Sequence, residues 1–315
     1  RDHRRFSVVT AHYSAVGASL LATLKHFLGA AWTDELAADW SAAYGLIAST
    51  MVQAAEGASE TSPDWWGAEV VSVERRTLDL AVVTVRPDQP LEYRPGQSMA
   101  VEVPQRPRLW RYLSPANAPK PDGFIEFHVQ LVDGGQVSTS IVRHLKVGDR
   151  IKLGAPIGGQ LTRPDDKSRD LLMVAGGSGL APLRAVLEEI DQEFQSTGEA
   201  PRVELLHGVR VPWSLYEHRL LTWLAGREWF TYTPVISDDS TNPGERGLVG
   251  AVAAGRPGIE DRLALVCGPP AMVEHTVSEL VASGLPREEI RFEQFDSHAA
   301  EAVRMPVPTT TGSER

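Results

Sequence analysis

The sequence of 315 residues contains a single cysteine, Cys267, so no disulfide can form within the chain. No cysteine or histidine cluster has the spacing of zinc ligands, and a reducing compartment follows as the simplest setting, which predicts a cytoplasmic protein. No apolar run reaches the roughly 18 residues that a membrane helix needs, and no signal peptide is recognisable. We therefore expect no membrane association.

Basic residues are also in short supply, with 31 Lys and Arg against 41 Asp and Glu and a net charge of −10. A polyanion would be repelled on average, so nucleic acid is not an expected partner. Apolar residues at 42% and charged residues at 23% are typical of globular proteins, and the length accommodates two or three domains. Because the chain begins at Arg1 within a helical pattern, we expect further residues before it in the full protein.

Residues 1–56 show helical periodicity. Apolar side chains recur at helical spacing over residues 16–28, and Thr33 is a suitable N-cap for a second helix. Two helices alone cannot bury a sizeable core, so other parts of the protein are expected to cover them. Residues 57–67, rich in Gly, Ser, Thr and Pro, are predicted to form a linker.

The rest of the chain shows two different sequence patterns. Over residues 68–168 short β-branched runs alternate with turns, which predicts a small antiparallel β-barrel. Over residues 169–297 strands, glycine turns and helices alternate, which predicts a parallel α/β sheet. The polar tail 298–315 is predicted to be disordered. The predicted strands are 70–73, 80–85, 99–103, 124–131 and 150–153, then 171–175, 203–207, 230–236 and 263–267.

Two loops carry the clearest chemical signal. Gly176–Gly179 directly follows a predicted strand and precedes a helix, where glycine allows backbone amides to approach a pyrophosphate. Cys267–Pro270 ends a second buried strand, with Pro270 suited to the first turn of a helix. Either loop alone is compatible with a simple structural turn. Together, at the carboxyl edge of one parallel sheet, they predict a dinucleotide site.

With these motifs the sequence resembles the ferredoxin–NADP reductase superfamily over residues 68–297. The family's motifs occur in order, as Arg111–Ser114, Gly134–Thr139, Gly176–Pro182, Cys267–Pro270 and the late aromatic Phe295. The resemblance implies a barrel that binds FAD, an α/β domain that binds NAD(P)H, and hydride transfer between the two cofactors.

The resemblance also assigns residue roles. Arg111 would pair with an FAD phosphate, and Ser114 would hydrogen-bond the flavin near its reactive nitrogen. Phe295 would cover the nicotinamide-facing side of the flavin, with Glu293 close by, so Ser114, Glu293 and Phe295 are the catalytic candidates of the reductase. The other residues assigned to FAD and NAD(P)H binding are Tyr112, Leu113, His128, Val129, Gly135, Gln136, Val137, Ser138, Thr139, Gly176, Gly177, Ser178, Gly179, Pro182, Cys267, Gly268 and Pro269.

Two positions refine this expectation. Leu113 stands where the family has an aromatic that stacks on the flavin, and Tyr112 faces the other side of the strand, so we expect FAD to bind but to be lost more readily. Arg210 follows the predicted strand 203–207. In the family, residues at the end of this strand bind the adenosine ribose of the nicotinamide nucleotide, and Tyr216 is assigned to the same site. Arginine there favours NADPH, although NADH stays open.

Residues 1–56 resemble the proximal half of a flavohaemoprotein globin, with His3, Tyr13, Val16, Trp40 and Tyr44 in the family's order. The resemblance makes His3 the haem iron ligand and Tyr13 a catalytic neighbour. It implies that electrons pass from NAD(P)H through FAD to haem, where oxygen oxidises nitric oxide. Because the distal half of a globin is absent, haem b is expected only if that half is present in the full protein.

Two alternatives are open. The first is a haem-free reductase that hands electrons to a separate ferredoxin, monooxygenase or quinone. The second is a globin-type sensor or binding protein with an attached reductase. A Soret band in the absorption spectrum of the full-length protein distinguishes the haem-containing hypotheses from the haem-free one.

Overall fold

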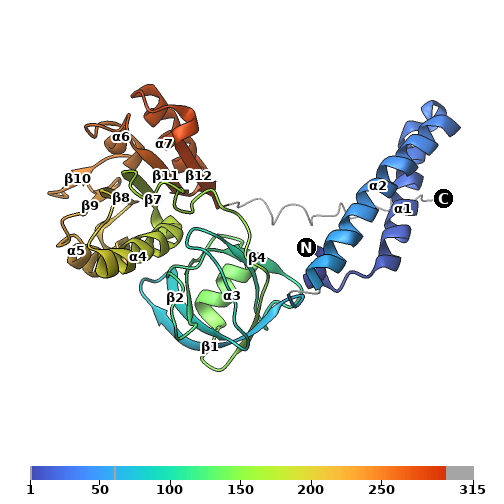
Figure 1. Ribbon diagram of the computed structural model, residues 1–315, viewed down its shortest axis with the longest axis horizontal. Coiled ribbons are helices and arrows are strands. Elements are labelled where there is room, and N and C mark those ends of the chain that lie inside the picture. Colours follow the sequence, from blue (N-terminus) through green and yellow to red (C-terminus); the bar gives the residue numbers. More distant parts are fainter. Residues whose placement is uncertain (1, 60–61, 296–315) are drawn as a thin grey trace, which may run out of the picture.

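The computed structural model describes residues 2–59 and 62–295, with no account of the side chains of residues 2 and 3. The expected iron ligand His3 and the expected disordered tail therefore lie outside what is described. Figure 1 shows three parts, a pair of long helices, a barrel-like sheet and an α/β unit, and the barrel lies between the other two.

The helical part comprises the short 3₁₀ helix η1 (Asp2–Phe6), α1 (Thr10–Leu28), the 3₁₀ turn η2 (Gly29–Ala31) and α2 (Asp34–Ser59). Thr33 caps α2 as predicted, since its hydroxyl accepts a hydrogen bond from the Leu36 amide at 3.1 Å. Because the single Gly57 does not stop an alanine-rich helix, α2 continues into the expected linker.

The two helices contact each other at one close crossing. A side chain on Gly17 would collide with the Tyr44 ring, and the Tyr44 hydroxyl donates to the Tyr13 carbonyl at 2.6 Å. Of the two helices only Gly17 and Ala58 are buried, whereas Phe27 is 81% exposed. The helices were predicted from their periodicity, but the expected cover over their apolar faces is not found among the described residues.

The barrel part is a six-stranded antiparallel sheet in the order β4-β3-β6-β1-β2-β5. An isolated bridge between Pro115 and Phe127 brings the first and last strands together, so the sheet is nearly closed. The helix α3 lies across it in Figure 1, with Val137 and Ile141 in the barrel core. The elements are β1 (Trp66–Arg75), β2 (Leu80–Pro87), β3 (Met99–Glu102), β4 (Trp110–Leu113), β5 (Ile125–Gln130), α3 (Gln136–His144) and β6 (Arg150–Leu153).

The α/β unit is a parallel six-stranded sheet in the order β10-β9-β8-β7-β11-β12. Alternate residues of the central strand β7 face two helical layers, Met173 toward α4 and Val174 toward α7, which explains its continuous apolar sequence. The elements are β7 (Leu171–Gly176), η3 (Gly177–Gly179), α4 (Leu180–Thr197), β8 (Val203–Val209), η4 (Pro212–Ser214), α5 (His218–Leu224), β9 (Phe230–Ile236), β10 (Glu245–Arg246), α6 (Val249–Ala254), β11 (Leu263–Gly268), α7 (Pro270–Ala282), η5 (Arg287–Glu289) and β12 (Ile290–Gln294).

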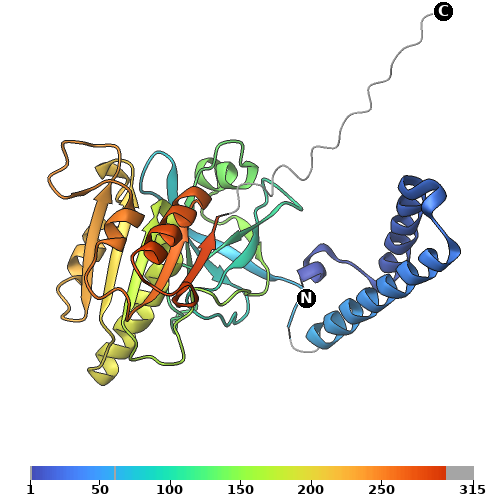
Figure 2. The same ribbon diagram turned by 90° about the horizontal axis from the view of Figure 1, so that it is seen from above.

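The chain leaves β7 toward β8 on one side, and β11 lies on the other side of β7. The loops that follow β7 and β11 therefore meet where the strand order reverses, which is where open α/β sheets bind ligands. Figure 2, turned by 90°, shows the helical pair well apart from this sheet. Among the described residues, none of the helices has the length and apolar character of a membrane span.

Candidate functional site

Strand β4 lies at the edge of the barrel sheet and, within the described part of the chain, pairs with β3 alone. Arg111 and Leu113 alternate with Trp110 and Tyr112, so the two pairs of side chains face opposite sides of the strand. Arg111 is half-buried, and within the described part of the chain no carboxylate lies within ion-pair distance of it. A partly desolvated guanidinium of this kind fits a phosphate oxygen pair. Ser114, also half-buried, follows directly on the strand.

The other face of β4 is covered by the N-terminal segment. The Arg5 guanidinium lies 5.2 Å from the Tyr112 ring centroid and 5.4 Å from that of Trp110, and it donates to the Tyr112 hydroxyl at 2.9 Å. The structure therefore does not bring Tyr112, which was assigned to cofactor binding, to the side of Arg111 and Leu113.

The N-terminus of α3 offers backbone donors to an anion. Gly134 has φ of +73°, and Gly135 occupies the N-cap without a side-chain cap. Ser138 is half-buried there, with its hydroxyl accepting from the Val132 amide at 3.2 Å, and Gln136 and Thr139 lie on the same first turn. These groups fit a pyrophosphate. Val137 differs, because its side chain is buried in the barrel core and cannot reach a ligand.

The two glycine loops of the α/β unit touch. A Cβ on Gly179 would overlap the Cys267 carbonyl oxygen and lie 2.8 Å from the Gly268 Cα, and a Cβ on Gly176 would lie 2.8 Å from the Met272 Cε. Only glycine permits this approach, which leaves a backbone cradle at the carboxyl ends of β7 and β11. Ser178 lies within the first loop, exposed Pro269 within the second, and buried Pro182 in the first turn of α4.

The acidic side chain of Glu293 on β12 and the aromatic side chain of Phe295, directly after that strand, lie beside this cradle. The Phe295 amide donates to the Gly268 carbonyl at 3.1 Å, and Phe295 is half-buried against the core. Burial raises the pKa of Glu293 to about 7, and a Cβ on Gly158 would lie 3.3 Å from its Oε1. Burial also raises the pKa of the Cys267 thiol well above its usual range, so that thiol stays protonated.

Two of the residues assigned to cofactor binding are in contact with each other. His128 Nδ1 lies 3.0 Å from the Tyr216 hydroxyl, where the barrel meets the α/β unit, and the two rings are edge to face. Tyr216 therefore directs its hydroxyl at the barrel and not toward an adenosine ribose. Val129, the neighbour of His128, is buried in the barrel core, so only its backbone could meet a cofactor. The sequence interpretation missed the contact between His128 and Tyr216 because the two residues come from distant segments.

Arg210, at the end of β8, is highly exposed and pairs with Asp238 through Nε at 2.6 Å. The Arg210 charge also lowers the pKa of Asp238, after the larger effect of the hydrogen bond from Ser237. Asp238 was not predicted, although its position directly after the expected strand 230–236 could have suggested it. The guanidinium predicted to meet a 2′-phosphate is thus neutralised by a carboxylate.

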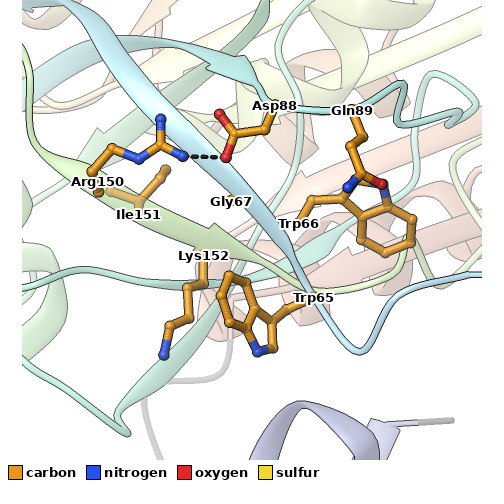
Figure 3. Close-up of a pocket in the computed structure, with 8 residues that line it drawn as sticks. All are labelled: Trp65, Trp66, Gly67, Asp88, Gln89, Arg150, Ile151 and Lys152. Atoms are coloured by element: carbon orange, nitrogen blue, oxygen red, sulfur yellow. Dashed lines mark hydrogen bonds and ion pairs between the residues drawn. The ribbon is translucent and has the colours of Figure 1, made fainter.

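A separate cavity, shown in Figure 3, lies between β1, β6 and the end of β2. Lys152 Nζ lies 4.8 Å from the Trp65 ring centroid and 2.9 Å from Glu102 Oε1, and Arg150 bonds to Asp88. The charged side chains that line this cavity are therefore paired with one another or with a neighbour, and none of the predicted site residues lines it. Over residues 2–59 and 62–295 no group of three or more His, Cys, Asp and Glu side chains is placed to hold a metal ion.

Comparison with known proteins gives two family matches. Residues 67–160 match the oxidoreductase FAD-binding domain, and residues 173–278 match the oxidoreductase NAD-binding domain. Together they cover the barrel and most of the α/β unit. The parts of the molecule that hold Arg111, α3 and the glycine loops are therefore an FAD-binding and an NAD-binding unit.

The relatives are reductases. The reductase component of a phenol 2-monooxygenase from Pseudomonas sp. (strain CF600) is 32% identical over 67% of this chain and 60% of its own length. A ferredoxin–NAD(P)+ reductase from Metapseudomonas resinovorans is 31% identical over 72% of this chain and 68% of its own length. The solved ferredoxin reductase in carbazole 1,9a-dioxygenase has a TM-score of 0.65 at 30% identity, covering 75% of this chain and 71% of that one.

The expectation that the chain is a flavohaemoprotein is wrong, because the relatives at 30% identity or more are reductases of oxygenase systems. A solved flavohaemoglobin from Malassezia yamatoensis overlays 93% of this chain and 77% of its own length with a TM-score of 0.76, but at 17% identity it shows the fold alone. Haem b, nitric oxide and oxygen as substrates, the globin sensor and the iron-ligand role of His3 lose their basis. Tyr13 lies on α1, and its catalytic assignment rested on the same resemblance.

Proposed function

This chain belongs to the ferredoxin–NAD(P)+ reductase type of FAD- and NAD-binding oxidoreductases, and from that premise we propose that it passes electrons from NAD(P)H through FAD to a separate iron–sulfur or oxygenase component. The observation that carries the proposal is the convergence of the Gly176–Gly179 and Gly268 loops, with Glu293 and Phe295 beside them, at the sheet edge that faces the barrel. The relatives' partners, a ferredoxin and a phenol monooxygenase, support this class of acceptor.

In this proposal the protein's side chains and backbone amides bind the two cofactors and orient them. When bound, FAD accepts the hydride of NAD(P)H and releases electrons to the acceptor. In the proposed arrangement Arg111 and the α3 amides hold the FAD phosphates, Ser114 orients the flavin edge, and Leu113 packs against it without aromatic stacking. The glycine cradle holds the NAD(P)H pyrophosphate, and Phe295 closes the site against water.

The division into domains is part of the proposal. We assign residues 68–168 to FAD binding and residues 169–297 to NAD(P)H binding, and the matches at 67–160 and 173–278 support this division. The helical residues 1–56 form a separate part, and the linker assigned to 57–67 includes the last turn of α2 and the first residues of β1.

Glu293 gives the electron-export step a pH dependence. Its pKa is raised to about 7, so the carboxyl is protonated below that pH and ionised above it. Only the ionised form can take up the proton released as electrons leave the site, so the rate of acceptor reduction is expected to rise from about pH 6 to about pH 8 and then level off. Steady-state rates across this range should lose the inflection in Glu293→Gln. An unchanged inflection in that variant rules out the assignment.

Asp238 is expected to set the preference for NADH. Its carboxylate forms an ion pair with the Arg210 guanidinium, and the pair lies at the surface at the end of β8. A 2′-phosphate has to displace Asp238 or accept its repulsion, so Asp238→Asn should lower the KM for NADPH relative to NADH by about tenfold, which corresponds to ~1.4 kcal/mol. The ratio of the two kcat/KM values measures it, with Asp239→Asn as the adjacent control. A ratio that moves equally in both variants contradicts a specific role.

The acceptor is tested with the FAD-reconstituted protein under anaerobic conditions. NADH is added with a plant-type [2Fe–2S] ferredoxin, and reduction of the ferredoxin is followed by its visible absorbance. The proposal predicts reduction that requires both NADH and FAD. Flavin that is reduced by NADH but reacts with dioxygen alone, and with neither ferredoxin nor a reconstituted oxygenase component, contradicts it.

A further inference from the structure

One face of strand β5 carries three polar side chains, each of which contacts a different element of the α/β unit. Glu126 Oε1 accepts from Arg184 of α4 at 2.7 Å, His128 contacts Tyr216 before α5 at 3.0 Å, and Gln130 Oε1 accepts from the Ser178 amide at 3.4 Å. The spacing of two residues places all three on one side of the strand.

We propose that this face of β5, with the His128–Tyr216 hydrogen bond at its centre, is an interdomain clamp that positions the nucleotide loop Gly177–Gly179 against the barrel and so sets the geometry of hydride transfer. Tyr216 and His128 are thus positioning residues, and the inference rests on the proposed reductase function. In this arrangement neither side chain needs to touch NAD(P)H.

The hydrogen bonds at the centre have fixed directions. Burial would raise the pKa of Glu126, but the hydrogen bond from His128 and the Arg184 charge lower it to about 2, so the carboxylate accepts from His128 Nε2 at 3.0 Å. Burial lowers the pKa of His128 and raises that of Tyr216 well above its usual range. His128 is therefore neutral with its proton on Nε2, and its Nδ1 accepts from the Tyr216 hydroxyl.

Burial is the main cause of both pKa shifts, and the charged side chains around the pair have smaller effects. The basic side chains of Arg184 and Lys120 and the acidic side chain of Glu217 lie near it, and Arg184 Nε lies 3.3 Å from Glu217 Oε2. Glu217 is almost fully buried, and Arg184 also donates to the Ala116 carbonyl at 2.6 Å. Because burial lowers the pKa of His128 and raises that of Tyr216, both groups stay neutral, and we expect the clamp to hold across the pH range in which Glu293 changes its charge.

The far side of the clamp reaches the nucleotide loop itself. The fully buried His207 packs edge-on to the Tyr216 ring at 6.0 Å and donates from Nε2 to the Gly177 carbonyl at 3.0 Å. Gly177 has φ of +52°, and a Cβ there would lie 2.9 Å from Gln130 Oε1. The loop is thus held from the sheet side by His207 and from the barrel side by Gln130, with Tyr216 packed against His207.

Such a clamp matters because hydride transfer depends steeply on the placement of its two partners. A misplacement of about 1 Å can cost on the order of a hundredfold in rate. Tyr216 lies between the barrel and His207, which bonds to the loop. Loss of the Tyr216 hydrogen bond should therefore loosen the loop without removing a contact to the nucleotide.

The test is Tyr216→Phe, which removes the hydroxyl and keeps the ring. In rapid mixing of the FAD-loaded protein with NADH, the clamp predicts that flavin reduction slows about tenfold to a hundredfold while the Kd for NADH changes less than threefold. The matched control is Tyr232→Phe on β9, whose buried hydroxyl has no hydrogen-bond partner within the described part of the chain. It should behave as the wild type.

A second readout needs neither NADH nor turnover. Amide hydrogen exchange over residues 176–179 should be faster in Tyr216→Phe than in the wild type and unchanged in Tyr232→Phe. Adding His128→Phe to Tyr216→Phe should change little further, because two residues that act through one bond are not additive.

The outcomes separate the two proposals. Wild-type protein that binds FAD but is reduced by neither NADH nor NADPH removes the reductase proposal, and the exchange comparison still decides the clamp. Exchange and reduction rates in Tyr216→Phe equal to those of the wild type overturn the clamp. A raised Kd for NADH with an unchanged reduction rate also overturns it, and returns Tyr216 to the nucleotide-binding role.

Discussion

Arg111→Ala is expected to raise the Kd for FAD about a hundredfold, so that the protein is purified largely without flavin. The guanidinium is half-buried on the edge strand β4, and among the described residues no carboxylate pairs with it. A charge-assisted, bidentate contact with a phosphate is worth about 3 kcal/mol in such a setting, which corresponds to the predicted factor. Leu113 cannot compensate, because it provides no aromatic stacking.

Titration of the apoprotein with FAD, followed by flavin fluorescence, measures this effect. Arg106→Ala is the control, since Arg106 is exposed on the preceding loop and its side chain bonds only to the Gln105 carbonyl among the described residues. The control should keep the wild-type Kd. If Arg111→Ala binds FAD as tightly as Arg106→Ala does, Arg111 does not hold the phosphate, and the flavin site has to be sought elsewhere on the barrel.

Gly179→Ala is expected to abolish use of NAD(P)H while leaving FAD bound. The added Cβ would overlap the Cys267 carbonyl oxygen and lie 2.8 Å from the Gly268 Cα. Backbone atoms on both sides cannot move independently, so the two loops must separate, and the pyrophosphate loses the amides of both. We expect kcat/KM for NADH to fall at least a hundredfold, with a smaller loss of thermal stability.

Gly255→Ala provides the matched comparison in the same unit, because the nearest atoms to its added Cβ are at ordinary contact distance, 3.6 Å or more. It should leave kcat/KM unchanged. The Kd for FAD should be the same in both variants, since the barrel is untouched. Full activity in Gly179→Ala means that the two loops do not form the nucleotide cradle.

Local patterns predicted much of the reductase. The runs 150–153 and 230–236 became strands with the expected bounds, because β-branched segments between turn residues leave little alternative. Gly176–Gly179 was found for the same reason, as glycine between strand and helix is a local signal. Strand β12 was missed, since its polar sequence depends on pairing with β11 to be a strand.

Tertiary proximity could not be predicted in the same way. Glu126 and Arg184, or His128 and Tyr216, are far apart in the sequence and meet only because the barrel and the α/β unit dock. His128 and Tyr216 were therefore both assigned to cofactor binding, and their contact with each other was not predicted. The globin interpretation failed for a related reason, because a histidine followed by amphipathic helices is a pattern that many helical pairs share.

The most direct test of the account is an anaerobic titration of the FAD-reconstituted protein with NADH and with NADPH, followed through the visible absorbance of the bound flavin. The account predicts that one equivalent of a nicotinamide nucleotide reduces one equivalent of FAD, with no haem or other carrier added. Flavin that stays oxidised in the presence of excess NADH and excess NADPH, while remaining bound to the protein, contradicts it.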